Sequence, residues 1–443
     1  MKWFFLFFGL FLFVTGTGLS AQETILLDWD IDSIFAEEPQ ESPEDEATPD
    51  TDEITVIQML NRRSLTFGAS YSFSSSIYPG WKEPPWNSIG KEDENYSNRN
   101  TFAWTPIVKV RTSFDLDAQI SRVFGVKSTF YFTIPDSVSY FRFFLRDFFF
   151  DYNLFDTAFI RGGKYNLKWG ISPNYGFTNL LARVPKNIPS HDSFILKADI
   201  PTGVGGFQFL ALTRSDLTGG TRINRRNIGV GGKFNLAHRK FDLDAGAFYH
   251  YEMPLRLFLS VKTTFRNTEL YSEGLAAFDI RKDDEYIEAE GSPGSSGAFN
   301  FGFARDFLND KLSVNGELFY NTEGNSFFFS PRTDFEDSKI SPFISGLNIA
   351  LNILYRFEGR GNPRFFFRTL YATQENSAQL TPGIRINLWS HIELYFAVPM
   401  TLGSREGYYY TNPVIFDREN NPRRFAVILL LTLSGNLRYT HYF

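Results

Sequence analysis

The feature that most constrains this chain is an alternation of apolar and polar residues that recurs along most of its length. In one such segment Leu347, Ile349 and Leu351 alternate with Asn348 and Asn352. Successive side chains of a β-strand point to opposite faces, so each segment predicts a strand with one apolar and one polar face. Many such strands in succession favour a closed barrel with an apolar solvent outside and water inside.

The connections between these segments supply a second pattern, because long ones alternate with short ones. Transmembrane barrels have short turns on the periplasmic side and longer loops outside, which places both chain ends in the periplasm. The pattern predicts an antiparallel up-and-down transmembrane β-barrel of about 18 strands, or 16 if the weak segment 193–200 is a loop. The expected external connections are 78–100, 135–137, 169–192, 214–225, 252–254, 281–297, 322–344, 372–379 and 403–422. The expected short turns centre on Asp117, Phe155, 201–203, His238, Asn267, Asn309, 359–361 and Ser390.

The composition agrees with a membrane barrel. The chain has 443 residues, of which 50 are Phe and 21 are Tyr, yet its mean hydropathy is only -0.22. No apolar run beyond residue 20 is long enough for a transmembrane helix, which needs about 20 residues. A large soluble β-sandwich or propeller is the alternative fold class. The chain contains no cysteine, so it has neither disulfides nor a thiolate metal site.

The N-terminal residues divide into three expected segments before the barrel. Residues 1–21 have the charged start, apolar core and small-residue end of a secretory signal peptide. Residues 22–53 contain 13 Asp and Glu and no Lys or Arg, which predicts an acidic, disordered periplasmic segment. Residues 54–63 form a short segment before the barrel and are a candidate plug, and residues 64–443 form the barrel domain.

The C-terminal sequence resembles the last strand of bacterial outer-membrane β-barrel proteins of the porin-like type. Leu437, Tyr439 and the terminal Phe443 lie on one face of that strand, with His441 as a departure from the pattern. The resemblance implies that this strand is the signal read by the barrel assembly machinery. It also implies an outer-membrane location in a diderm, Gram-negative type bacterium.

Basic residues on the polar phase of four early strands predict a positively charged wall inside the pore. Exposure of these side chains to lipid would cost about 2–4 kcal/mol each at mid-bilayer, which favours the lumen. Rings or walls of Lys and Arg are how pores favour anions. Simple pairing with Asp115, Asp117, Asp147 and Asp151 is an equally weighted reading. The predicted wall consists of Lys109, Arg111, Lys127, Arg142, Arg146, Lys164 and Lys168.

The 169–192 connection is a candidate constriction loop because loops of this length in compact folds are usually functional. It contains Trp169 and the apolar run at Asn179, Leu180 and Leu181. The segment before it predicts Tyr165, Leu167 and Trp169 on the lipid face. An ordinary external loop is the alternative.

The leading functional hypothesis is a porin-like outer-membrane channel for passive diffusion of small polar, and in one version anionic, solutes. Two alternatives remain open: a transporter of hydrophobic compounds of the fatty-acid type, and a structural or adhesive surface barrel. The five His are scattered without a catalytic or metal-binding spacing, so no enzymatic activity, cofactor or metal is expected. The expected partners are outer-membrane lipid, small solutes and the assembly machinery, with no nucleic acid. The oligomeric state is left open.

Overall fold

The computed structural model describes a barrel and parts of its connections, and the remaining residues are outside the described set. The described residues are 63–82, 102–134, 142–165, 167, 169–174, 193–214, 228–238, 241–250, 255–278, 295–322, 346–404, 407–411, 415–416 and 422–442. The expected segments 1–21 and 22–53 therefore lie outside the described residues, and the first strand begins at Ser64.

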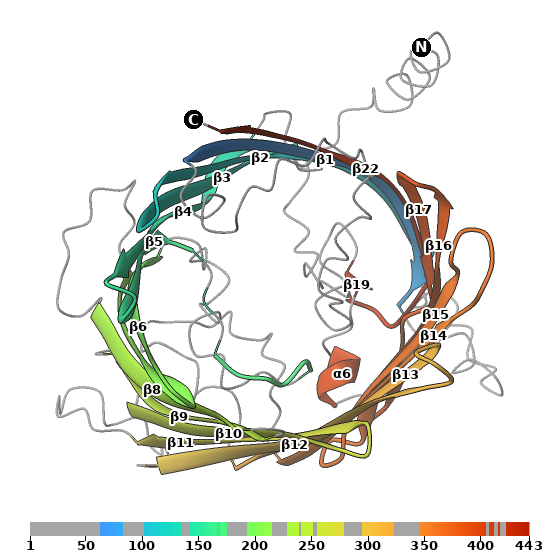
Figure 1. Ribbon diagram of the computed structural model, residues 1–443. Helices are drawn as coiled ribbons and strands as arrows, with labels where there is room; N and C mark the ends of the chain where they lie inside the picture. The colour runs from blue at the N-terminus through green and yellow to red at the C-terminus, as the bar shows by residue number, and fades with distance from the viewer. Residues whose placement is uncertain are drawn as a thin grey trace, which may run out of the picture.

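The barrel consists of 18 antiparallel strands in up-and-down order (Figure 1). Two of them are interrupted, so that β17 with β18 form one wall strand and β21 with β22 form another. The strands are β1 (Ser64–Trp81), β2 (Phe102–Ser121), β3 (Phe124–Ile134), β4 (Arg142–Leu154), β5 (Ala158–Lys164), β6 (Ser193–Thr202), β7 (Gly205–Arg214), β8 (Ile228–His238), β9 (Phe241–His250), β10 (Leu255–Phe265), β11 (Thr268–Phe278), β12 (Ser295–Phe307), β13 (Leu312–Asn321), β14 (Gly346–Arg356), β15 (Arg364–Ala372), β16 (Ser377–Trp389), β17 (Ile392–Ala397), β18 (Met400–Gly403), β21 (Phe425–Ala426) and β22 (Ile428–Tyr442).

The sheet closes because the first strand pairs with the last. The register of β1 on β22 runs from Ser64 opposite Tyr442 to Ile77 opposite Leu429. Each strand also pairs with its neighbour in sequence, and β6 is a full strand, which decides for 18 strands over 16. A closed ladder leaves no sheet edge with unpaired backbone groups. No helix among the described residues is long and apolar enough to cross a membrane.

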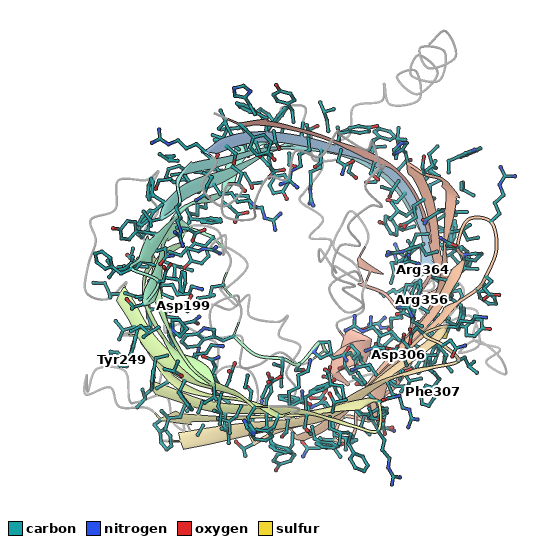
Figure 2. The ribbon with its side chains drawn as sticks, viewed as in Figure 1. Asp199, Tyr249, Asp306, Phe307, Arg356 and Arg364 are labelled. Atoms are coloured by element: carbon teal, nitrogen blue, oxygen red, sulfur yellow. The ribbon has the colours of Figure 1, made fainter. Side chains whose placement is uncertain are left out.

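The outer face of the sheet is apolar and the inner face carries polar residues, whereas a soluble β-sandwich has an apolar inner face. On β12 Phe299, Phe301 and Phe303 are exposed on the outside, whereas Asn300 between them is fully buried on the inside. Figure 2 shows the same alternation at the end of this strand, with Asp306 on the inner side and Phe307 on the outer side. The outward apolar and inward polar phases predicted for β12 and β14 are thus confirmed.

The long and short connections gather at opposite ends of the barrel. We call the end with the connections after β2, β4, β6, β8, β10, β12, β14 and β16 the short-turn rim, and the other end the long-loop rim. In the two-residue turn between β10 and β11, Arg266 and Asn267 have φ values of 47° and 62°, as such a turn between right-twisted strands requires. Both β1 and β22 have their chain-terminal ends at the short-turn rim.

The turn expected at Asp117 is wrong. β2 continues through Asp117, which lies opposite Lys127 on β3 and is 3.9 Å from its ammonium group. The chain turns after Ser121, whose hydroxyl accepts hydrogen bonds from the backbone N–H groups of Val123 and Phe124. The alternation of β2 is unbroken up to this point, so a polar residue alone was a poor marker of the turn.

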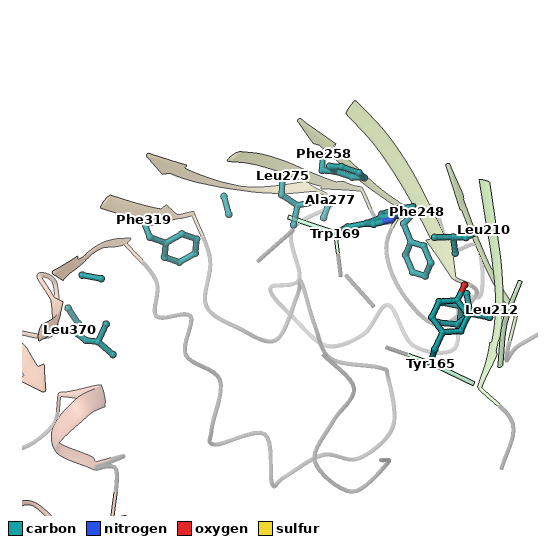
Figure 3. Close-up of a cluster of buried hydrophobic side chains, with 14 of the residues drawn as sticks. Tyr165, Trp169, Leu210, Leu212, Phe248, Phe258, Leu275, Ala277, Phe319 and Leu370 are labelled. Carbon is teal, nitrogen blue, oxygen red and sulfur yellow. The ribbon is translucent and has the colours of Figure 1, made fainter. Parts of the chain in front are cut away.

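The inner face is not polar throughout. A cluster of buried apolar side chains lines the inside from β6 to β15, including Leu210, Phe248, Phe258, Phe319 and Leu370 (Figure 3). Trp169 and Tyr409, which belong to connections and not to wall strands, pack in the same cluster. The inner wall is apolar where segments of the chain fold against it.

The opposite faces of β22 provide a test of the lipid and water sides. We expect Leu431→Arg to destabilise the protein by about 2–4 kcal/mol, because Leu431 is 44% exposed on the outer face and would place a cation in lipid. Ser434→Arg on the inner face is the matched control, with an expected change within about 0.5 kcal/mol. The free energy of unfolding in lipid vesicles measures both, and equal losses would contradict the assigned faces.

Candidate functional site

The chain leaves the wall at the end of β5 and turns into the lumen (Figure 1). We call residues 165–174 the inward segment, of which 166 and 168 lie outside the described residues. The prediction that Tyr165 and Trp169 face lipid is wrong, since they are 7% and 1% exposed within the inner cluster. A period of two applies only to a chain in the ladder, and the ladder ends at Lys164.

The register of β5 also corrects the position of Lys164. Its backbone lies opposite Phe148 on β4 and Phe194 on β6, whose rings are 50% and 37% exposed on the outer face. Lys164 therefore shares the outward phase and does not belong to the inner wall. Arg161 on the same strand does face inward, where it pairs with Asp151 at 2.6 Å.

Trp169 anchors the start of the inward segment. Its indole N–H donates to Gln208 Oε1 on β7 at 2.6 Å, and its ring lies 5.3 Å from that of Phe258 on β10. Gly231 on β8 makes room for it, because a Cβ there would lie 3.0 Å from the indole. The sequence marked Trp169 as part of a constriction loop, and the structure places it inside the barrel.

Two buried carboxylates hold the rest of the inward segment. Glu273 on β11 is 0% exposed, and its Oε1 accepts hydrogen bonds from the backbone N–H groups of Ile171 and Ser172. Glu317 on β13 is 2% exposed and accepts from Ser172 Oγ at 3.0 Å and from the Asn174 N–H at 3.1 Å. The segment thus crosses the inner faces of several strands by polar contacts.

Tyr271 bridges the two strands that carry these carboxylates. Its hydroxyl donates to Glu317 Oε1 at 2.8 Å and accepts from Asn315 Nδ2 at 2.7 Å. The ring passes over Gly302 on β12, where a Cβ would lie 2.3 Å from ring carbons. Asn352 on β14 extends the network by donating to Asn174 and Asn315.

A second connection also enters the lumen, from the opposite side of the long-loop rim. The short helix α6 (Tyr408–Thr411) and β19 (Ile415–Phe416), which pairs with β20 (Pro422–Arg423), lie inside the ring of strands in Figure 1. The Tyr409 N–H donates to Ser377 Oγ at 3.2 Å, and Arg424 Nε donates to the Tyr410 carbonyl at 2.8 Å. The sequence predicts only a long external connection at 403–422 and contains no sign that part of it folds into the lumen.

The described members of the predicted basic wall lie beside aromatic and acidic partners. Arg111 on β2 and Arg146 on β4 lie over the Tyr131 ring at 5.7 and 5.3 Å, and Arg146 also donates to the Tyr131 hydroxyl. Arg146 lies 3.4 Å from Asp147, and Lys127 faces Asp117. These bases are partly neutralised by neighbouring acids.

The same pairing continues around the inner face. Each pair is partly exposed to solvent, so each contributes about 0–1 kcal/mol to stability. Within each pair the positive charge of the base and the negative charge of the acid offset each other. They include Arg161 with Asp151, Lys197 with Asp199, Lys233 with Asp244, Lys262 with Glu269 and Arg385 with Glu393.

Three arginines on neighbouring strands form a positive row that the sequence analysis missed. Arg364 on β15 lies directly opposite Arg356 on β14 and Arg385 on β16. Arg356 donates to the Asp310 carbonyl and Ser313 Oγ, and Arg385 lies 3.4 Å from Glu393. Like charges opposite each other destabilise a sheet, so this arrangement has a cost to stability. The inward phase of Arg364 and Arg385 could have been found from the outward Phe365.

A hydroxyl-rich strip covers the inner face where the barrel closes. Ser70, Ser72 and Ser74 of β1 lie opposite Asn436, Ser434 and Thr432 of β22. Ser70 Oγ is 2.6 Å from Ser113 Oγ of β2, so the two hydroxyls share one face of the sheet, opposite to the face on which Tyr71 is 49% exposed. Ser434 and Asn436 are solvent-exposed there, whereas the wall under the inward segment is buried.

Several other predicted site residues lie partly or wholly outside the described set. The side chains of Lys109 and Arg142 lie outside the described set, although their backbones pair with Ser74 and Thr133. Lys168, Asn179, Leu180, Leu181 and Phe443 lie outside the described residues altogether. Leu437 and Tyr439 share the outer face of β22, where they are 74% and 62% exposed. Among described residues no group of three or more His, Asp or Glu is arranged to hold a metal ion.

Comparisons with known proteins identify the fold. No family model matches the sequence, and no curated protein matches it. Among solved structures, the outer membrane protein OpdK of Pseudomonas aeruginosa superposes with a TM-score of 0.52 and 8% identity, over 84% of this chain and 99% of that one. OccAB3 of Acinetobacter baumannii gives a TM-score of 0.50 and 9% identity, over 84% and 99%. The chain thus has the fold of bacterial outer-membrane porin-like barrels.

Gly302 offers a test of the bridge between the wall strands. We expect Gly302→Ala to destabilise the protein by about 1–3 kcal/mol, because the added methyl group collides with the Tyr271 ring and displaces its hydroxyl from Glu317. Gly274→Ala on β11 is the matched control, since a Cβ there meets nothing within 4 Å. Unfolding free energies measure both variants, and a Gly302→Ala protein as stable as the control would refute the bridge.

Proposed function

We propose that the protein is a porin-like channel of the outer membrane for passive diffusion of small polar solutes. The observation that carries the proposal is the asymmetry of the lumen. The inward segment is tied to the wall from β7 to β14, whereas Ser434 and Asn436 of the hydroxyl-rich strip remain open to solvent. A barrel of 16–18 strands is wide enough for an aqueous channel.

An anion preference is the finer part of this proposal. It rests on the row of Arg356, Arg364 and Arg385, which places three positive side chains directly opposite one another on neighbouring strands of the inner face. Positive side chains on a pore wall lower the energy of a passing anion and raise that of a cation. Lys127 and Arg146 add less net positive charge to the lumen, because each lies beside an aspartate.

The orientation and assembly of the barrel belong to the same proposal. Short turns face the periplasm in barrels of this class, which places both chain ends there. Leu437 and Tyr439 present an apolar outer face on the last strand, as an assembly signal for the barrel machinery requires. The acidic residues 22–53 would then extend into the periplasm.

The hydrophobic-transport alternative is less well supported. It requires an apolar pocket in the lumen, and the buried apolar side chains that line the inside are packed against Trp169 and Tyr409 of the chain itself. These residues therefore hold inward connections in place. The adhesive alternative depends on external loops that lie outside the described residues.

Conductance in planar lipid bilayers tests the proposed channel. We expect the refolded mature protein to give discrete current steps, because the lumen has a water-accessible polar wall. Folding is checked independently by the protein's resistance to protease in vesicles. A folded protein that gives no current steps would overturn the channel proposal.

Ion selectivity tests the arginine row. We expect Arg364→Gln to shift the reversal potential in a salt gradient towards cations, because it removes the central charge of the row. Lys311→Gln is the matched control, since Lys311 sits in a rim turn beside Glu358 and off the inner wall. A reversal potential that is the same in both variants and the wild type would refute the role of the row.

A further inference from the structure

We propose that Glu273 and Glu317 form a pH-sensitive latch that keeps the inward segment against the barrel wall. The inference rests on the proposed channel only for its electrical readout. The latch itself concerns the position of residues 165–174 relative to β11 and β13, which is set by the contacts described above.

The contacts concentrate on a short stretch of the inward segment. Four donors reach the two carboxylates from this stretch: the N–H groups of Ile171, Ser172 and Asn174, and the Ser172 hydroxyl. Backbone amides that leave the ladder need acceptors, and a buried donor without one costs about 1–3 kcal/mol. The carboxylates of Glu273 and Glu317 thus stand in for the strand partner that these amides lack.

The contacts described above are donated to these oxygens by amides and hydroxyls, which carry no charge. The nearest charged or titratable side chains on the inner faces of β10 to β14 are Arg256, Lys262, Glu269, Tyr271, Asp306 and Arg356. Of these, Tyr271 donates to Glu317, Lys262 pairs with Glu269 at 2.7 Å, and Arg356 donates to the Ser313 hydroxyl. The contacts between the segment and the two carboxyl groups are therefore stronger when those groups are ionised.

Protonation weakens this arrangement. Hydrogen bonds to an ionised carboxylate are roughly twice as strong as those between neutral groups. A proton on either carboxyl group removes the charge and occupies one of its oxygens, so the segment loses part of its attachment. Acid conditions therefore favour release of the segment from the wall, and neutral conditions favour the attached position.

Trp169 reports on the position of the segment without any current measurement. Its indole is buried against the inner wall, where it contacts Phe258 of β10, so release of the segment exposes the indole to water. The Trp169 signal is the difference between spectra of a protein and of the same protein carrying Trp169→Phe. We expect this difference emission to shift to longer wavelength as the pH falls from about 7.5 to about 4, a range that covers the titration of most carboxyl groups in proteins.

The decisive comparison uses a neutral mimic of the protonated latch. In the double variant Glu273→Gln with Glu317→Gln, we expect the long-wavelength Trp169 emission already at neutral pH and a loss of the pH dependence. Glu269→Gln is the matched control, because Glu269 is an inner-face carboxylate on β11 that pairs with Lys262 and does not contact the segment. This control should keep the wild-type pH response.

Current steps recorded over the same pH range show whether the latch acts on the pore. We expect the wild-type step size to change on acidification, and that of the double variant to stay constant. A double variant that keeps the wild-type Trp169 response overturns the latch, as does a wild type with no acid shift. An acid shift in Trp169 without any current in any variant overturns the channel proposal and leaves the latch standing.

Discussion

The structure depends on one constraint: a sheet that spans a membrane must satisfy every backbone hydrogen bond within itself. A lipid environment offers no partner for a free N–H or C=O group, so an open edge is not tolerated. This chain meets the constraint by pairing β1 with β22 over 14 residues of register, from Ser64 to Ile77. Once the ladder is closed, the two faces of each strand are committed to lipid and to the lumen.

The closed ladder also explains how function can be built inside it. Connections that leave the wall carry backbone groups which no longer have strand partners. The inward segment finds them on side chains of β11 and β13, and α6 finds one on Ser377 of β16. Apolar residues of the wall strands, such as Phe258 and Phe319, belong to one buried cluster with Trp169 and Tyr409 of these connections. The lumen is therefore shaped by segments docked on the wall between β7 and β16, with a polar surface left where β1 meets β22.

The sequence predicted the fold well because the relevant signal is local. Alternation within β12 and β14 depends only on the solvent on each side, and the expected 18 strands are confirmed. The turn at Asp117 failed because strand length is set by cross-strand pairing with Lys127 and not by local polarity. The position of Trp169 failed for a related reason, since a segment outside the ladder follows tertiary contacts. Glu273 and Glu317 could be recognised as inward acids, but the sequence contains no sign of what they bind.

The central claim is that the lumen bounded by the inner phase of the strands is the path of the solute. The absence of cysteine makes a direct test available, in which a charged thiol reagent is added to open channels. We expect Ser72→Cys, on the inner face of β1, to lose current stepwise on modification, and Phe73→Cys, on the outer face, to be unaffected. Loss of current in the Phe73→Cys channel alone, or in neither, would contradict the account.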